Sequence, residues 1–159
     1  MPSSQKILSL PELLRKLQSW RIKGDKIVFT NGCFDLIHIG HVQYLEEARA
    51  LGDRLVLGLN ADISVSILKG ESRPIVAEDA RAGVLAGLSS IDAVCLFSEE
   101  TPAKLIEAVD PDVLVKGGDY QISEIVGADH VLKNGGEVKR IAFLPGHSTS
   151  RIVEKIRGE

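Results

Sequence analysis

The sequence has few of the residues that mark metal-binding or secreted proteins. Only two of its 159 residues are cysteines, Cys33 and Cys95, and they form no Cys-x-x-Cys pair. His130 and His147 lack metal-ligand spacing to each other or to the cysteines, so we interpret both as surface or loop residues. The sequence therefore predicts no protein metal cage and no disulfide framework, and it favours a reducing cytoplasm.

Long apolar runs and clusters of basic residues are also missing. No apolar stretch approaches the length of a membrane span, and residues 1–10 are polar, unlike a signal peptide. A formal net charge of −3, without a dense Lys/Arg run, gives no overall attraction to nucleic acid. The composition, 44% hydrophobic and 26% charged, is typical of a globular protein. The expected partners are therefore small molecules, not membranes or nucleic acid.

No internal repeat and no long linker divides the chain, so we expect a single domain over residues 1–159. Ser9 and Glu12 have the spacing of a capping box, which predicts a helix over 10–20 within an N-terminal helical extension, residues 1–24. Periodicity then predicts helices over 41–51, 77–88 and 102–109 and strands over 26–30, 54–60, 93–97, 113–115 and 138–142. This alternation indicates an α/β fold with a Rossmann-like, doubly wound parallel sheet.

The loop after the first predicted strand carries two histidines, His38 and His41, on either side of Gly40. In doubly wound sheets, ligands bind beyond the carboxyl ends of the strands, where loops and helix N-termini meet. Two imidazole donors there suit a triphosphate whose charge moves onto departing pyrophosphate, and the glycine allows close approach of the backbone. A chance His-x-Gly-His is the alternative. The position between a strand and a helix favours the phosphate site.

The same loop resembles a known family. It matches the Gly-x-Phe-Asp-x-x-His-x-Gly-His signature of the cytidylyltransferase-like nucleotidyltransferases at Gly32, Phe34, Asp35, His38, Gly40 and His41. Segments 60–62, 68–74, 115–120 and 134–138 resemble the adenylyltransferase portion of bacterial ADP-heptose synthases. The resemblance implies transfer of AMP from ATP to D-glycero-β-D-manno-heptose 1-phosphate for lipopolysaccharide core biosynthesis. A sugar-kinase domain precedes this portion in bifunctional members, so the chain resembles a stand-alone transferase or an excised domain.

The resemblance also implies roles for individual residues. Catalysis is expected from His38, His41 and Lys69. Nucleotide binding is expected from Asn31, Gly32, Cys33, Phe34, Asp35, Gly40, Asp119, Ser148, Thr149 and Ser150, and acceptor binding from Arg81, Lys116 and Gly117. Simpler roles stay open: a solvated lysine in a polar segment for Lys69, an exposed helix arginine for Arg81, a turn residue for Asp119, and a helix cap for Ser148.

Other functions remain to be compared with this one. In CTP-dependent alditol-phosphate cytidylyltransferases an arginine stands where this chain has Phe143, which argues against that alternative. An FAD synthetase-like adenylyltransferase stays open, and so does a non-catalytic nucleotide-binding module, which the intact histidines and Lys69 disfavour. A Rossmann dehydrogenase lacks support, because no Gly-x-Gly-x-x-Gly follows the first strand. Mg²⁺ is expected to arrive with the triphosphate, and a homodimer is a family-level expectation.

Overall fold

Five parallel strands form one sheet in a computed structural model that describes residues 2–158. The strands are β1 Ile27–Gly32, β2 Arg54–Asn60, β3 Ala93–Phe97, β4 Val113–Gly117 and β5 Glu137–Ile141. Their order in space is β3-β2-β1-β4-β5, so the direction of winding reverses between β1 and β4. This arrangement confirms the predicted α/β, Rossmann-like doubly wound sheet, and the reversal point is where such sheets open a ligand crevice.

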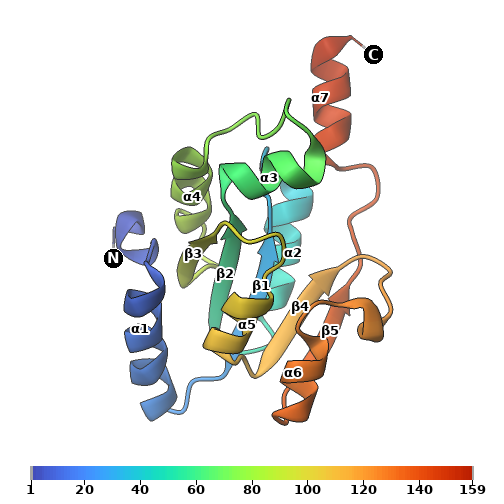
Figure 1. Cartoon of the computed structure of the whole chain (residues 1–159). Helices are drawn as coiled ribbons and strands as arrows, with labels where there is room; N and C mark the ends of the chain where they lie inside the picture. Colours follow the sequence, from blue (N-terminus) through green and yellow to red (C-terminus); the bar gives the residue numbers. More distant parts are fainter. Residues whose placement is uncertain (1, 159) are drawn as a thin grey trace.

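Helices cover both faces of the sheet (Figure 1). One face packs against α1 Leu10–Ile22, α5 Ala103–Val109 and α6 Ala128–Lys133, and the other against α2 Ile39–Arg49 and α4 Glu78–Ala86. Because both faces are covered, the strands read as nearly continuous apolar runs. Beyond the carboxyl ends of the strands lie α3 Asp62–Lys69 and α7 Thr149–Arg157, which projects away from the sheet (Figure 1). No helix within residues 2–158 is long and apolar enough to cross a membrane.

The N-terminal helix is packed into the core. Leu13, Leu17 and Trp20 of α1 are buried with side chains of β1, β2 and β3. The expected capping box is present: the Ser9 hydroxyl accepts a bond from the Glu12 N–H at 3.4 Å, and the Glu12 carboxylate accepts one from the Ser9 N–H at 2.7 Å. A 3₁₀ helix, Ser3–Lys6, precedes α1. Residues 10–22 therefore contribute to the same core as the sheet.

Three short elements were not expected from the sequence. These are α3, α6 and the 3₁₀ helix Ile122–Glu124. Lys69, expected in a polar segment, is instead the last residue of α3. The apolar side chains Ile63, Ile67 and Leu68 of α3 are exposed. Apolar residues in this segment therefore do not mark a buried helix face.

The ladder between β1 and β4 is short. It joins only Val28 to Val113 and Phe29 to Leu114, whereas β1 pairs with β2 along six residues. Past this point the Val115 carbonyl accepts hydrogen bonds from the Thr30 hydroxyl at 3.1 Å and from the Tyr44 hydroxyl at 3.4 Å. The Thr30 side chain thus replaces the missing ladder partner and keeps β1 bonded to β4 beyond the paired residues.

Candidate active site

His38 and His41 form the start of α2. His38 is the N-cap residue, and its Nδ1 accepts a hydrogen bond from the Gly40 N–H at 3.1 Å. The Nδ1 of His41 accepts one from the His38 N–H at 3.3 Å, and the two rings stack with centroids 3.9 Å apart. An imidazole that accepts at Nδ1 carries its proton on Nε2 when neutral. Both histidines therefore present an Nε2–H donor, at a helix N-terminus that already favours anions.

The protonation state of the histidines follows from their surroundings. Burial lowers the pKa of His41 to about 4, and the charges of His38 and Lys69 add to the shift. Burial also lowers the pKa of His38, with a further contribution from His147. Both imidazoles are therefore neutral at pH 7, and each keeps one N–H, on Nε2, that can donate to a phosphate oxygen.

Two glycines allow this loop to pack closely. A Cβ on Gly40 would lie 2.8 Å from Cε1 of His38, and one on Gly32 would lie 2.8 Å from Cε2 of Phe34. Phe34 itself has a φ of 46°, in the left-handed region that phenylalanine rarely adopts, and its ring centroid lies 5.2 Å from that of His41. Strained backbone of this kind often marks a functional loop.

Asp35, which the sequence predicts to bind the nucleotide, makes several contacts within the protein. Its side chain is buried and accepts hydrogen bonds from the N–H groups of Ile75 and Val76 at 2.9 and 2.8 Å and from Nε of Arg73 at 2.6 Å. Burial alone would raise the pKa of this carboxyl, but these partners together hold it below its usual value. Asp35 thus anchors the segment between α3 and α4 to the histidine loop.

Arg81, which the sequence predicts to bind the acceptor, likewise makes contacts within the protein. It is buried, with 1% of its surface exposed. Its guanidinium donates to the carbonyls of Cys33, Asn60 and Val76 and pairs with the Asp62 carboxylate at 2.7 Å. All three nitrogens of the guanidinium are engaged, and Arg81 joins the segments that follow β1 and β2.

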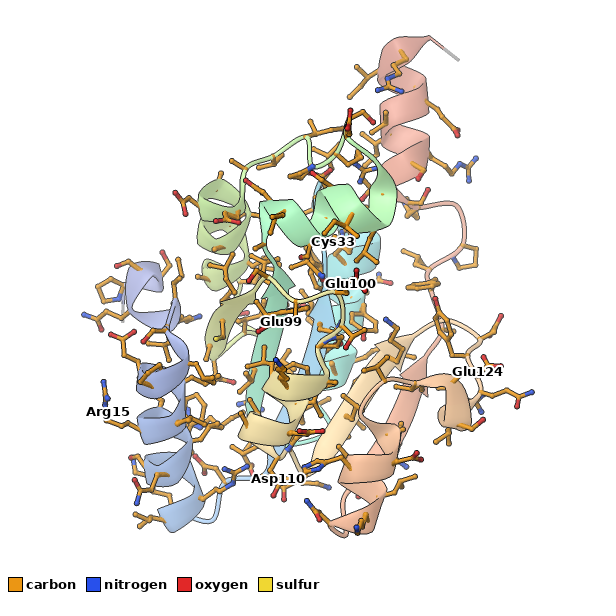
Figure 2. All side chains as sticks on the ribbon, viewed as in Figure 1. Arg15, Cys33, Glu99, Glu100, Asp110 and Glu124 are labelled. Atoms are coloured by element: carbon orange, nitrogen blue, oxygen red, sulfur yellow. The ribbon has the colours of Figure 1, made fainter. Side chains whose placement is uncertain are left out.

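Cations gather around Cys33, which Figure 2 labels at the end of β1. Burial raises the pKa of its thiol, while the charges of Lys69, Arg81 and Arg73 act in the opposite direction. Burial lowers the pKa of Lys116, which is also within electrostatic reach of Cys33. Lys69 is exposed at the end of α3. Arg73 and Arg81 are paired with Asp35 and Asp62, which leaves the charges of Lys69 and Lys116 for phosphate groups.

Arg73, for which the sequence predicted no role, is a candidate site residue. Among the described residues, its Nη2 is buried without a hydrogen-bond partner. Buried donors are rarely left unpaired, so a ligand or a water is expected to complete its bonding. The only sequence signal was its place in the 68–74 segment, next to Lys69.

Lys116 and Gly117, two further predicted site residues, end β4. The Lys116 ammonium lies 5.5 Å from the centroid of the Tyr120 ring. Gly117 packs closely under Phe143, since a Cβ there would lie 2.6 Å from Cε1 of that ring. Asp119 is exposed. Lys116 is within electrostatic reach of Cys33, and Phe143 covers Gly117 while its ring stays 66% exposed.

The start of α7 closes the site near His38. The Ser148 hydroxyl caps the helix by accepting from the Arg151 N–H at 3.1 Å. This is the simpler role that the sequence left open for it. The Thr149 hydroxyl donates to the Leu36 carbonyl at 3.1 Å, which ties α7 to the histidine loop. Ser150 is exposed. Within residues 2–158 no group of three His, Cys, Asp or Glu side chains is arranged to hold a metal ion.

Comparisons with known proteins agree with this geometry. The cytidylyltransferase-like family model matches residues 29–155. The chain is 56% identical over 153 residues to bifunctional protein HldE of Methylobacillus flagellatus, covering 96% of this chain and 31% of that protein. It is also 56% identical over 156 residues to HldE of Wolinella succinogenes, covering 98% and 32%. The chain therefore spans about a third of the length of these relatives.

Solved structures show the same fold. The lipopolysaccharide core biosynthesis protein of Thermoplasma volcanium superposes with a TM-score of 0.61 at 29% identity, over 76% of this chain and 98% of that one. A pantoate–β-alanine ligase from Francisella tularensis shares only the fold, with a TM-score of 0.61 at 13% identity over 96% and 78%. With the paired histidines and the family match on the same residues, this chain belongs to the cytidylyltransferase-like family and is a nucleotidyltransferase that uses a nucleoside triphosphate.

Proposed function

We propose that the protein transfers AMP from ATP to D-glycero-β-D-manno-heptose 1-phosphate, giving ADP-heptose and pyrophosphate. A phosphate oxygen of the sugar attacks the α-phosphorus, the bond from that phosphorus to the β-phosphate oxygen breaks, and pyrophosphate leaves with the electron pair. The observation that carries the proposal is the pair of neutral Nε2–H donors of His38 and His41 at the crevice between β1 and β4. Such donors stabilise charge as it moves during transfer.

The cations around Cys33 have complementary roles in this proposal. Lys69 neutralises the charge on the transferred α-phosphate, because its charge already acts on His41 and Cys33. Lys116 holds the phosphate of the acceptor from the opposite strand, with the sugar beside Tyr120. Holding two anions at attack distance is the main catalytic task when the attacking group is already a nucleophile. Mg²⁺ is proposed to enter bound to the triphosphate, since the site itself supplies donors and cations.

The choice of ATP and heptose 1-phosphate rests on relatives. Bifunctional protein HldE is 56% identical over nearly the whole chain, and the Thermoplasma structure carries a lipopolysaccharide core biosynthesis name. Phe143, which packs on Gly117, stands where the alditol-phosphate cytidylyltransferases have an arginine. This difference disfavours CTP with an alditol phosphate as the substrates. A cytoplasmic location, where both substrates arise, belongs to the same proposal, and the homodimer stays a prediction.

A pyrophosphate-release assay tests the assignment. ATP, CTP, GTP and UTP are each paired with heptose 1-phosphate, glycerol 3-phosphate and FMN, and products are identified by mass. We expect ATP with heptose 1-phosphate to exceed CTP with glycerol 3-phosphate by roughly a hundredfold or more in kcat/KM, since groups built for one base are left unpaired by another. Equal efficiency for the CTP pair, or preference for FMN, overturns the choice of substrates.

A further inference from the structure

Two buried hydroxyl groups connect α2 with β4, the strand that carries Lys116. Thr30 of β1 has 0% of its surface exposed, and Tyr44 of α2 has 9%. Their hydroxyl oxygens lie 2.7 Å apart, and the Thr30 hydroxyl donates to the Val115 carbonyl of β4 at 3.1 Å. Helix α2 lies behind the sheet where β1 and β4 adjoin (Figure 1). The hydroxyl pair therefore joins three elements at the point where the ladder between β1 and β4 has ended.

The direction of these hydrogen bonds follows from their lengths. Each hydroxyl group has only one hydrogen to donate. Because Thr30 donates to the Val115 carbonyl, the 2.7 Å bond must be donated by Tyr44, whose own distance to that carbonyl is longer, at 3.4 Å. Burial raises the pKa of Tyr44 to about 12, so its hydroxyl keeps the proton at neutral pH. The result is a chain of two bonds, from Tyr44 to Thr30 and from Thr30 to β4.

Tyr44 also lies against both neighbours of Lys116. Its hydroxyl oxygen is 3.4 Å from the Val115 carbonyl oxygen, and a Cβ on Gly117 would lie 3.2 Å from Cε2 of its ring. Successive side chains of a strand point to opposite faces of the sheet. Tyr44 therefore supports the strand backbone from one face, while the Lys116 side chain leaves on the other. Since α2 begins at the His38 cap, Tyr44 links the position of Lys116 to that of the histidine pair.

We propose that Tyr44 is a positioning residue for the acceptor: through Thr30 and Val115 it fixes the end of β4, so that Lys116 meets the acceptor phosphate at a set distance from the histidines. The inference rests on the proposed function for the role of Lys116. On its other edge β4 pairs with β5 along five residues, and this ladder does not depend on the hydroxyls. Loss of the Tyr44 hydroxyl is therefore expected to displace Lys116 without unfolding the sheet, and small displacements of a binding group are costly.

Calorimetric binding of the acceptor to the nucleotide-loaded enzyme tests this role. Tyr44→Phe removes only the hydroxyl, Thr30→Val replaces a hydroxyl with a methyl group, and Thr30→Ser, the matched control, keeps the hydroxyl. Wild type and each variant are loaded with α,β-methylene-ATP and Mg²⁺ and titrated with heptose 1-phosphate, and urea unfolding verifies that each is folded. We expect Tyr44→Phe and Thr30→Val to weaken acceptor binding by roughly fivefold, as loss of one hydrogen bond would, and Thr30→Ser by less than about twofold. Affinity for α,β-methylene-ATP should stay within about twofold of wild type in all three.

A second background separates the positioning of Lys116 from a general structural effect. Lys116→Ala should weaken binding of heptose 1-phosphate by roughly tenfold, because the ammonium no longer contacts the phosphate. Adding Tyr44→Phe to Lys116→Ala should then cost less than about twofold, since no ammonium is left to displace. An equal loss in both backgrounds overturns the inference. So does an unchanged acceptor affinity in Tyr44→Phe, or an equal loss of affinity for α,β-methylene-ATP.

The proposed function can fail separately from this inference. If the pyrophosphate-release assay identifies another phosphorylated acceptor, the assignment of heptose 1-phosphate fails, and the same titrations with that acceptor test Tyr44. If Lys116→Ala binds the acceptor as wild type does, the proposed role of Lys116 fails and the inference fails with it. If Lys116→Ala binds the acceptor weakly and Tyr44→Phe binds it as wild type does, the inference fails alone.

Discussion

At the scale of single residues, His38 serves the fold and, in the proposed function, the chemistry as well. Its Nδ1 caps α2, which leaves Nε2–H as the donor of the neutral ring. An N-cap contributes about 1 kcal/mol, so removing this side chain costs stability as well as a phosphate donor. Substitution by alanine alone cannot separate these two effects. A substitution that keeps the helix cap but removes the imidazole can separate them.

We therefore predict different outcomes for His38→Ala and His38→Asn. Both variants should lose roughly a hundredfold or more in kcat, because each lacks the Nε2–H donor. Only the alanine variant should lose about 1 kcal/mol of unfolding free energy, since asparagine is a strong N-cap. Pyrophosphate-release kinetics and urea unfolding measure the two quantities. Near wild-type turnover in the asparagine variant would remove His38 from the chemistry.

His41 should make the protein sensitive to mild acid. Its pKa is about 4 in the folded protein, against an ordinary value of 6.5. Between these values the unfolded chain binds a proton that the folded one excludes, so stability is complete above pH 6.5 and falls as the pH drops toward 4, by up to about 3 kcal/mol.

Urea unfolding of wild type and His41→Gln between pH 7 and 4 measures this loss. Glutamine keeps a side-chain acceptor for the His38 N–H, as in an ordinary capping box, but does not titrate. The slope of stability against pH should therefore be shallower in the variant. Identical slopes would mean that His41 is not held neutral by burial.

At the scale of elements, the segment between α3 and α4 depends on one carboxylate. Asp35 accepts from Ile75, Val76 and Arg73 while buried. Asp35→Asn should leave at least one of these donors unpaired, which costs about 1–3 kcal/mol. Hydrogen exchange should accelerate over residues 70–77 and remain unchanged in α5. Asp110→Asn, at an exposed position, is the control, and unchanged exchange over 70–77 would show that other contacts hold the segment.

Elements whose packing shows as a local sequence pattern could be predicted, whereas contacts between distant residues could not. Strands and the helices α1, α2, α4 and α5 show their buried faces as local periodicity, so they were predicted within about three residues. By contrast, α6 has only six residues, and α3 exposes three large apolar side chains. The roles of Asp35 and Arg81 depend on partners 19 to 48 residues away, and local spacing holds no record of such contacts.

At the scale of the whole molecule, α1 and the sheet share one core, and Trp20, the single tryptophan, reports on their contact. We predict that Trp20 fluorescence and far-ultraviolet circular dichroism follow the same unfolding curve in urea, as for one cooperative domain. Leu17→Ala, at a buried position of α1, should shift both curves to lower urea together. The free energy of unfolding should fall by about 2–5 kcal/mol. An earlier fluorescence transition would identify residues 1–24 as an independent appendage.

The short seam between β1 and β4 has a mechanical consequence. Two residue pairs join a half that carries the histidines to a half that carries Lys116, whereas neighbouring ladders have five or six pairs. With fewer ladder pairs than its neighbours, and the Thr30 hydroxyl bonded to the Val115 carbonyl beyond them, the seam is expected to open more readily than the other ladders. Substrates whose phosphates contact both halves would hold the two halves together across the seam. Backbone amides beside the seam should then gain more protection from solvent exchange on ligand binding than amides in the outer strands β3 and β5.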